Sequence, residues 1–244
     1  MIQKDEFTSR LCAVFAKNKM GQLLSKEIAE KFYLLTEFML AENEKFNLTA
    51  ITDPDKIILS HYLDCAALAG RVPKGATVAD IGSGAGFPTL PLALLRHDVK
   101  ITSIDSTAKR TDYVRRAAEL LGLTNVKTVT MRAEDGGRSP EYREKFDTVT
   151  ARAVAEMRIL SELCLPYARL GGSFIAMKGK NAEFELGAAK RAVAMLGGRD
   201  TKTEEITLTD GVEVLSHPLI TVKKCERTPL AYPRVYAQIS KKPL

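Results

Sequence analysis

The feature that most constrains the fold is a change of hydrophobic rhythm near residue 72. Beyond it, short runs rich in β-branched residues alternate with segments long enough to form helices. The runs are ATVADI, KITSID, VKTVTM, FDTVTARA and SFIAMK. Strands separated by helix-length connections form parallel sheets whose two faces are covered by helices. We therefore predict an α/β core over residues 73–224 with a mostly parallel sheet.

Residues 1–72 have a helical pattern instead. Apolar residues recur at helical spacing between Ile28 and Met39, after Ser25, which is a candidate N-cap. Asp53-Pro54 predicts a second helix start, because Asp can cap a helix whose first position is Pro. That helix should run to Gly70. The segment is interpreted as an N-terminal helical lead-in.

The chain ends in a different pattern. The runs EITLT and EVLSHPLITVKK flank the turn signal Asp210-Gly211, which predicts an antiparallel element closing the sheet. From Thr221 to Leu244, six Lys or Arg residues face one acid. We assign residues 225–244 to a basic C-terminal tail. Such a tail suits a phosphate-rich partner, and a simple solvated tail is an equal alternative.

Composition excludes several classes of protein. The chain of 244 residues is 45% hydrophobic and 27% charged, as globular domains are. Its longest apolar run, of about nine residues, falls short of the roughly 18 that a membrane span needs, and its first residues mix both signs of charge. We expect a cytoplasmic protein with no membrane association. Four scattered cysteines and three histidines predict reduced, buried thiols and no metal site.

A glycine-rich loop follows the first predicted strand. The strand ends near Asp80 and leads through Gly82, Gly84 and Gly86 into a helix that starts near Pro88. Such glycines let the backbone turn tightly beside a ligand at the helix start. The second strand ends in Asp105, where a carboxylate can accept hydrogen bonds from ribose hydroxyls. The pattern indicates a cofactor that contains adenosine.

The spacing of the loop discriminates between two cofactors. Dinucleotide-binding loops read G-x-G-x-x-G, whereas this loop reads G-x-G-x-G-F, with Phe87 in place of the third glycine. No Lys or Arg lies between Ala76 and Leu95 to assist a diphosphate. S-adenosyl-L-methionine, which has no phosphate, therefore fits better. A nicotinamide-dependent dehydrogenase is the alternative enzyme.

Two further loops are expected at the same edge of the sheet. Ala133 and Glu134 follow the third strand and are interpreted as contacts to the adenine amino group; an ordinary charged loop is the alternative. Arg152 ends the strand that should border the glycine loop. Its guanidinium is expected to reach the cofactor's carboxylate or a substrate phosphate, rather than form a surface salt bridge.

Several segments together resemble the bacterial glucose-inhibited division protein B family, whose members methylate a guanine at N7 in 16S ribosomal RNA of the small subunit. They are EKFNLTAITDPDKIILSHYLDCAAL, VADIGSGAGFPTLPLALL, IDSTAKR, MRAED, VTARAVAEMRILSELCLP and FIAMKG. The resemblance implies a Rossmann-like S-adenosylmethionine-dependent methyltransferase sheet. It also implies cofactor contacts at Gly82, Phe87, Ala133, Glu134 and Arg152, and the 16S RNA or the small ribosomal subunit as partner.

The implied chemistry sets expectations for the site. Guanine N7 has a free lone pair, so it can attack the methyl group in line without losing a proton, and we expect no catalytic residue. His61 and Asp64, three residues apart on one helix, are candidates for holding the substrate, as is Lys178 at a predicted strand end. Structural hydrogen bonding and a solvated lysine are the alternatives. An RNA-binding assembly factor is the alternative outside enzymes, and a monomer is the favoured state.

Overall fold

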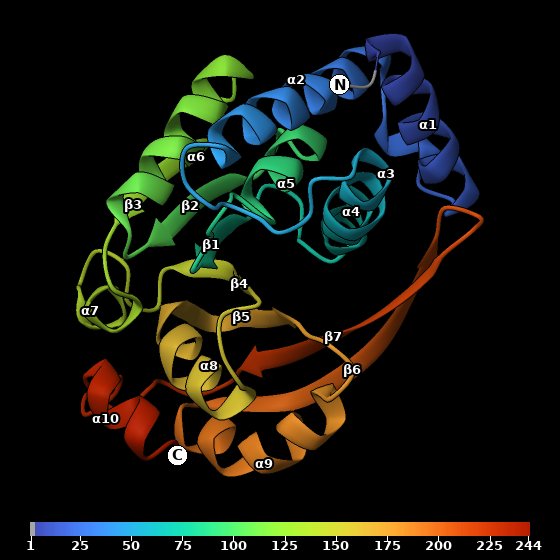
Figure 1. Ribbon diagram of the computed structural model, residues 1–244. Helices are drawn as coiled ribbons and strands as arrows, with labels where there is room; N and C mark the ends of the chain where they lie inside the picture. Colours follow the sequence, from blue (N-terminus) through green and yellow to red (C-terminus); the bar gives the residue numbers. More distant parts are fainter. Residues whose placement is uncertain (1–2) are drawn as a thin grey trace.

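A single sheet of seven strands organises the protein (Figure 1). The computed structural model describes residues 3–244. The strands are β1 (Thr77–Ile81), β2 (Lys100–Asp105), β3 (Val126–Thr130), β4 (Phe146–Arg152), β5 (Ala168–Met177), β6 (Gly198–Thr209) and β7 (Val214–Lys224). Their order across the sheet is β3-β2-β1-β4-β5-β7-β6; β1 to β5 run parallel, and β7 is antiparallel to β5 and β6. The predicted α/β sheet is confirmed.

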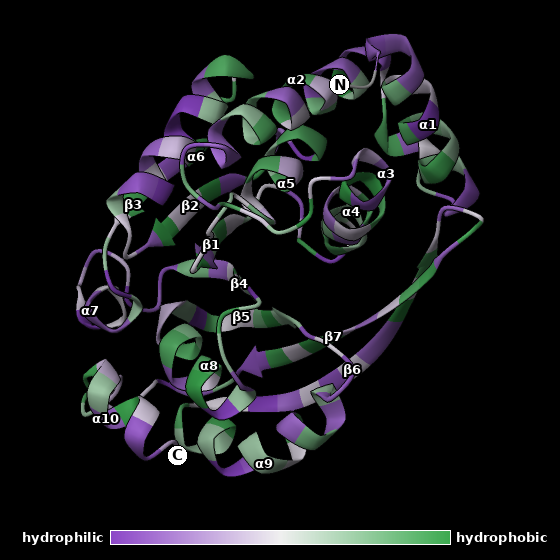
Figure 2. Ribbon diagram, in the orientation of Figure 1, coloured by the Kyte–Doolittle hydropathy of each residue, from purple (hydrophilic) through white to green (hydrophobic). Residues whose placement is uncertain are grey.

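Helices cover both faces of this sheet. They are α1 (Lys4–Lys17), α2 (Lys26–Asn43), α3 (Pro54–Ile57), α4 (Asp64–Ala69), α5 (Thr89–Leu95), α6 (Ala108–Leu120), α7 (Ala133–Arg138), α8 (Met157–Cys164), α9 (Ala182–Met195) and α10 (Tyr236–Lys241). Figure 1 shows α1 to α6 on one side and α8 to α10 on the other. Two hydrophobic clusters result, one for each face. Figure 2 shows hydrophilic colour gathered on α1 and α6, which form part of the outer surface.

The N-terminal helices begin where the capping residues predict. The Ser25 hydroxyl accepts a hydrogen bond from the Ile28 N–H, and the Asp53 carboxylate accepts one from the Lys56 N–H. The second helix is not a regular α-helix throughout, because a π-helical segment, Ile58–Leu63, separates α3 from α4. Such segments are frequent at functional sites. This one carries His61 and ends beside Asp64.

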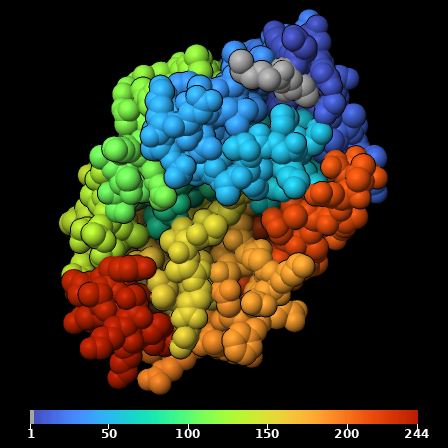
Figure 3. Space-filling model, in the orientation of Figure 1, coloured from blue at the N-terminus to red at the C-terminus, as the bar shows by residue number. Residues whose placement is uncertain are grey.

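The hairpin of β6 and β7 is longer than the two runs predict. β6 begins at Gly198, and its early residues are mostly exposed, so no alternation marks it as a strand. The hairpin reaches α1, where the Asn18 side chain pairs with both backbone groups of Thr209. Figure 3 shows the orange hairpin against the dark blue helix. The N-terminal helices are thereby tied to the far end of the sheet.

The C-terminal segment folds back onto the protein. Arg234 forms a bidentate pair with Glu162, whose side chain is fully buried. Ile239 of α10 is also buried, and the Arg143 guanidinium donates to backbone carbonyls within the segment. A freely solvated tail is therefore the wrong description of these residues.

The cysteines correct one expectation. Cys65 and Cys164 are buried, as predicted, but Cys12 and Cys225 are exposed because they lie on the outer side of α1 and just after β7.

Within residues 3–244, no His, Cys, Asp or Glu side chains cluster in a group of three or more that could hold a metal ion. In the same part of the chain, no helix has the length and apolar character that crossing a membrane requires.

Candidate functional site

The glycine loop lies at the carboxyl edge of the sheet, where β1 neighbours both β2 and β4. The connections leave β1 in opposite directions here, and ligands bind at such switch points in α/β sheets. Gly82, Gly84 and Gly86 all have positive φ, of 72°, 55° and 81°. A Cβ atom on Gly82 would lie 2.6 Å from a methyl carbon of Val154. Glycine is therefore required at Gly82 by conformation and by space.

A cavity of about 400 Å³ opens beside this loop, a volume typical of small-molecule sites. Its lining comes from the ends of β1, β2, β3 and β4 and includes Gly82, Asp105, Ala133 and Glu134. Asp105 is nearly buried, and its carboxylate accepts hydrogen bonds from the N–H groups of Gly84 (3.1 Å) and Thr107 (2.8 Å). The same carboxylate thus fixes the glycine loop and faces the cavity.

Glu134 lines the cavity and leaves an acceptor free there. Its residue surface is 6% exposed, and within residues 3–244 its carboxylate has neither a hydrogen bond nor an ion pair. Its oxygen atoms are not fully buried, so they remain accessible from the cavity. Neighbouring Ala133 is held by the Tyr167 hydroxyl, which donates to its carbonyl at 2.8 Å. The loop after β3 is thereby fixed with an acceptor aimed into the cavity.

Phe87 and Arg152 lie in an adjacent hollow of about 210 Å³, which shares Gly82 with the cavity. The Phe87 ring stacks on His61 with centroids 4.3 Å apart, and the Arg152 guanidinium carbon lies 5.2 Å from the Phe87 centroid. Arg152 also donates to the Ser60 carbonyl (3.0 Å), to Asp64 (3.2 Å) and to His61 (2.8 Å). The alternative that Arg152 forms a salt bridge on the protein surface is wrong, because the Arg152 side chain is only 17% exposed.

Two contacts compete for the His61 Nδ1 atom. The Arg152 guanidinium, 2.8 Å away, can only donate to it, whereas the Ser60 carbonyl, 3.2 Å away, can only accept from it. The shorter contact assigns Nδ1 as the acceptor and the proton to Nε2, which lies 3.2 Å from the Thr49 hydroxyl. Burial, followed by the positive charge of Arg152, lowers the pKa of His61 to about 4. The imidazole is therefore neutral near pH 7.

A third hollow, of about 350 Å³, continues past Arg152 toward β7. Asp64 and Lys178 both line it, with His217 of β7. Asp64 is 2% exposed, and one of its oxygens lies 3.3 Å from the His217 Nδ1 atom. Lys178 donates to the Ala155 carbonyl (2.8 Å) and pairs with Glu185 (2.7 Å), so two of its three donors are engaged within the protein. Asp64, Lys178 and His217 thus supply polar side chains to the lining of this hollow.

Asp80 supports the loop from below. It is 1% exposed and accepts hydrogen bonds from the hydroxyls of Thr89 (2.6 Å) and Thr150 (3.3 Å). Burial raises the pKa of Asp80 to about 6, although both hydroxyls favour the ionised form. Asp80 therefore joins β1, β4 and α5 at the point where the loop begins.

Two lining residues were not found from the sequence. Tyr236 of α10 lines the cavity beside the glycine loop, although it belongs to the segment assigned to a tail. His217 was placed in the correct strand without a role. No motif marks either residue, because only the docking of α10 on α8 and the insertion of β7 beside β5 bring them to the crevice.

The strand order and the crevice define the fold class, a Rossmann-like α/β sheet closed by an antiparallel strand. The fold is shared with an O-methyltransferase from Bacillus cereus in complex with S-adenosylhomocysteine (TM-score 0.55, 18% identity, 78% of this chain and 91% of that one). It is also shared with an O-methyltransferase from Thermotoga maritima (TM-score 0.53, 15% identity, 78% of this chain and 72% of that one).

Within that class, the family is also shown. Residues 28–211 match the family model GidB, described as rRNA small subunit methyltransferase G. The chain is 43% identical over 231 residues to the ribosomal RNA small subunit methyltransferase G of Clostridium perfringens (94% of this chain, 96% of the relative). It is 45% identical over 225 residues to the protein of that name from Lactobacillus acidophilus (91% and 93%). The chain belongs to this family.

Proposed function

We propose that the protein transfers the methyl group of S-adenosyl-L-methionine to N7 of one guanine in 16S ribosomal RNA. Membership of the family is the observation that carries this proposal, and the crevice supports it. The bond from N7 to the methyl carbon forms as the carbon–sulfur bond breaks, and the positive charge passes from sulfur to the purine. The cofactor supplies the activated methyl group, while the protein binds and orients.

The cavity beside the glycine loop is proposed to hold the adenosine end. Asp105 would accept from the ribose hydroxyls, because a carboxylate has about four acceptor sites and two are engaged by backbone N–H groups. The unpartnered Glu134 would accept from the adenine amino group. Gly82, Gly84 and Gly86 keep the loop backbone close to the ligand. The Tyr236 side chain would close the cavity on the side of α10.

The neighbouring hollows are proposed to receive the methionine end and the guanine. Phe87 stacks on His61 and also contacts the Arg152 guanidinium, which lies at the wall shared by both hollows. Asp64 would accept from the guanine N1–H or amino group, since it retains free lone pairs beside Arg152 and His217. Lys178 would contribute positive potential while it stays paired with Glu185.

The state of His61 agrees with a reaction that needs no general base. The Nδ1 lone pair of His61 is occupied by Arg152, and its pKa of about 4 makes the imidazole a weak base. Holding the reactants in line can contribute several kcal/mol by itself. We expect single-turnover methyl transfer to vary little between about pH 6.5 and 8.5.

The proposed substrate sets the remaining expectations. Guanine N7 lies in the deep major groove of A-form RNA, which side chains do not read, so the target should be a loop, bulge or splayed base. We propose a cytoplasmic monomer that acts on 16S RNA or the small subunit. Its proposed units are the helical lead-in (1–72), the methyltransferase core (73–224) and the basic C-terminal segment (225–244).

The test uses small ribosomal subunits from cells that lack the endogenous enzyme. Purified protein is incubated with these subunits and methyl-labelled cofactor, and the label is mapped by strand cleavage specific for N7-methylguanine. Cleavage at one guanine of 16S RNA supports the proposal. Asp105→Ala should lose cofactor affinity in calorimetry, whereas Asp200→Ala, an exposed acid far along the chain, serves as the control.

Failure would appear in two distinguishable forms. Cofactor binding without labelling of subunits or naked RNA would contradict the RNA substrate and would fit an assembly factor that keeps the cofactor for structure. A melting temperature raised by NADH, and by neither S-adenosylmethionine nor S-adenosylhomocysteine, would contradict the cofactor site as described.

A further inference from the structure

A further hollow, separate from the cavity and the two hollows of the crevice, lies at the opposite edge of the sheet. Its volume is about 920 Å³, and it is lined by residues just before β4 and at the start of β5. Along β4, the groove and the crevice at the carboxyl end of the strand are about 20 Å apart at the rise of an extended strand. At its near end the groove approaches the crevice, because Arg138 lies on α7, whose first turn carries Glu134. We call this hollow the basic groove and define it by Arg138, Arg143, Lys145, Arg169 and Arg227.

Two of its arginines carry charge that no carboxylate neutralises. The Arg138 Nε atom donates to the Pro233 carbonyl at 2.6 Å. The Arg143 guanidinium donates to the carbonyls of Gly137, Thr228 and Tyr232. Backbone carbonyls satisfy the N–H donors but carry no net charge. Both guanidinium groups therefore contribute their full positive charge to the groove.

The other three cations are accessible. Lys145 is exposed, and its ammonium group has no hydrogen bond or ion pair with the described part of the chain, residues 3–244. The Arg227 side chain is 80% exposed and lies 3.5 Å from Glu144, a carboxylate also approached by Lys224. Arg169 pairs with Asp147 at 2.6 Å and remains half exposed. Five cations thus line a groove where, among residues 3–244, Glu144 and Asp147 are the carboxylates that pair with them.

From this arrangement we infer that the basic groove binds the phosphate backbone of the substrate RNA, at a segment distant from the methylated guanine. The inference rests on the proposed function, because it requires an RNA substrate. Cations that face phosphates release counterions and supply affinity independent of sequence. Because the groove and the crevice lie at opposite edges of the sheet, one nucleotide cannot occupy both. The groove therefore favours large folded RNA over short fragments.

The C-terminal segment builds one wall of this groove. Arg227, Thr228 and Pro229 line it, and Arg143 holds the last two through their carbonyls. The segment thus contributes to RNA binding through a fixed wall. Leu170 and Leu230 are exposed at the groove and offer some apolar surface to a protein. Five cations against two exposed leucines favour RNA, and the experiment separates these two partners.

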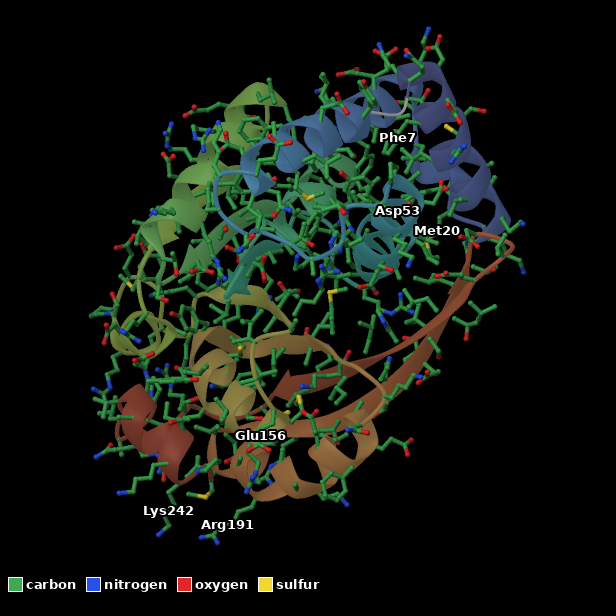
Figure 4. All side chains as sticks on the ribbon, in the orientation of Figure 1. Phe7, Met20, Asp53, Glu156, Arg191 and Lys242 are labelled. Atoms are coloured by element: carbon green, nitrogen blue, oxygen red, sulfur yellow. The ribbon has the colours of Figure 1, made fainter. Side chains whose placement is uncertain are left out.

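The test removes two accessible charges that have no structural hydrogen bonds in the protein. Lys145→Gln with Arg227→Gln is compared with Lys190→Gln and Arg191→Gln, which remove equal charge from the exposed side of α9 (Arg191 in Figure 4). Affinity for naked 16S RNA and for small subunits is measured as a function of salt. The slope of the logarithm of the binding constant against the logarithm of the salt concentration should become shallower by about one for each lost phosphate contact. For the groove variant, which removes two cations, it should therefore become shallower by about two. Cofactor affinity, measured by calorimetry, should be unchanged.

The outcomes divide clearly. A shallower salt slope and weaker binding to naked RNA for the groove variant, beyond those of the α9 control, support the groove. Equal behaviour of the two variants overturns it while leaving the proposed function intact, provided that wild-type protein methylates the subunit. Weaker binding to subunits alone assigns the groove to a ribosomal protein and overturns the RNA contact. No RNA binding or methylation by wild-type protein overturns both proposals.

Discussion

The ion pair between Arg152 and Asp64 gives the sharpest test of how the crevice is held together. In Arg152→Met, a side chain of similar length retains the contact with the Phe87 ring but loses the charge. The Asp64 side chain, 3% exposed, then keeps the His217 imidazole as its one side-chain partner within residues 3–244. The Ser60 carbonyl and the His61 Nδ1 atom lose a donor as well. The substitution leaves a buried carboxylate without its main compensation.

The magnitude follows from this burial. Removing one partner of a buried pair costs about 3 to 5 kcal/mol, from a total stability of about 5 to 15 kcal/mol. For a domain of this size each kcal/mol lowers the melting temperature by about 2 to 4 °C, so a fall of about 6 to 20 °C is expected. Adding Asp64→Asn removes the uncompensated charge and should recover part of the loss. A coupling energy of at least about 1 kcal/mol is expected between the two sites.

The assay is urea unfolding of wild type, both single variants and the double variant at pH 7.5. In parallel, the His61 ring is titrated by NMR in the folded Arg152→Met protein. Its pKa should rise from about 4 because the positive neighbour is gone, while burial, the larger cause, keeps it low. A single variant within 0.5 kcal/mol of wild type, a threshold typical of surface substitutions, would refute this account of the pair. A double variant whose loss of stability equals the sum of the two single-variant losses would also refute it.

Three further predictions concern the cofactor site. Gly82→Ala should lose more stability and cofactor affinity than Gly84→Ala. Both positions have positive φ, but only a Cβ at position 82 would lie 2.6 Å from Val154. Thermal melting and calorimetry compare the two variants. Tyr236→Ala should weaken cofactor binding with little change in melting temperature, since the ring lines the cavity and is 41% exposed; unchanged affinity would remove it from the site. Because burial raises the pKa of Asp80 to about 6 from 3.8, the native state retains a proton that the unfolded chain loses, and Asp80 makes stability fall as pH rises from about 4 to 6. Between pH 4.5 and 7.5, the free energy of unfolding of Asp80→Asn, measured in urea, should therefore increase relative to that of wild type by on the order of 2 kcal/mol. A difference between the two proteins that stays constant over this pH range would contradict the assignment.

The sequence predicted the regular parts of the fold because local patterns determine them. Runs rich in β-branched residues, separated by helix-length segments, located the five parallel strands, and Ser25 and Asp53 marked helix starts through their own side chains. The glycine loop was also predictable, since positive φ at three positions demands a residue without Cβ. Asp105 and Glu134 could be placed at one edge because the carboxyl ends of parallel strands meet there.

The sequence was less informative where contacts join distant segments. The length of β6 depends on pairing with β7 rather than on its own pattern, so its exposed first residues gave no signal. The two exposed cysteines were assigned to the interior because residue type predicts average burial and not the position of one side chain.

The sequence by itself determined the α/β class, the family and the glycine loop at the crevice. Tertiary structure alone decided that Arg152 joins His61 and Asp64, that Tyr236 reaches the cavity beside that loop, and that the C-terminal segment forms a wall of the basic groove. The physical reason is range. Backbone conformation and capping act over a few neighbouring residues, whereas burial and charge pairing act between groups that only the packed chain brings together.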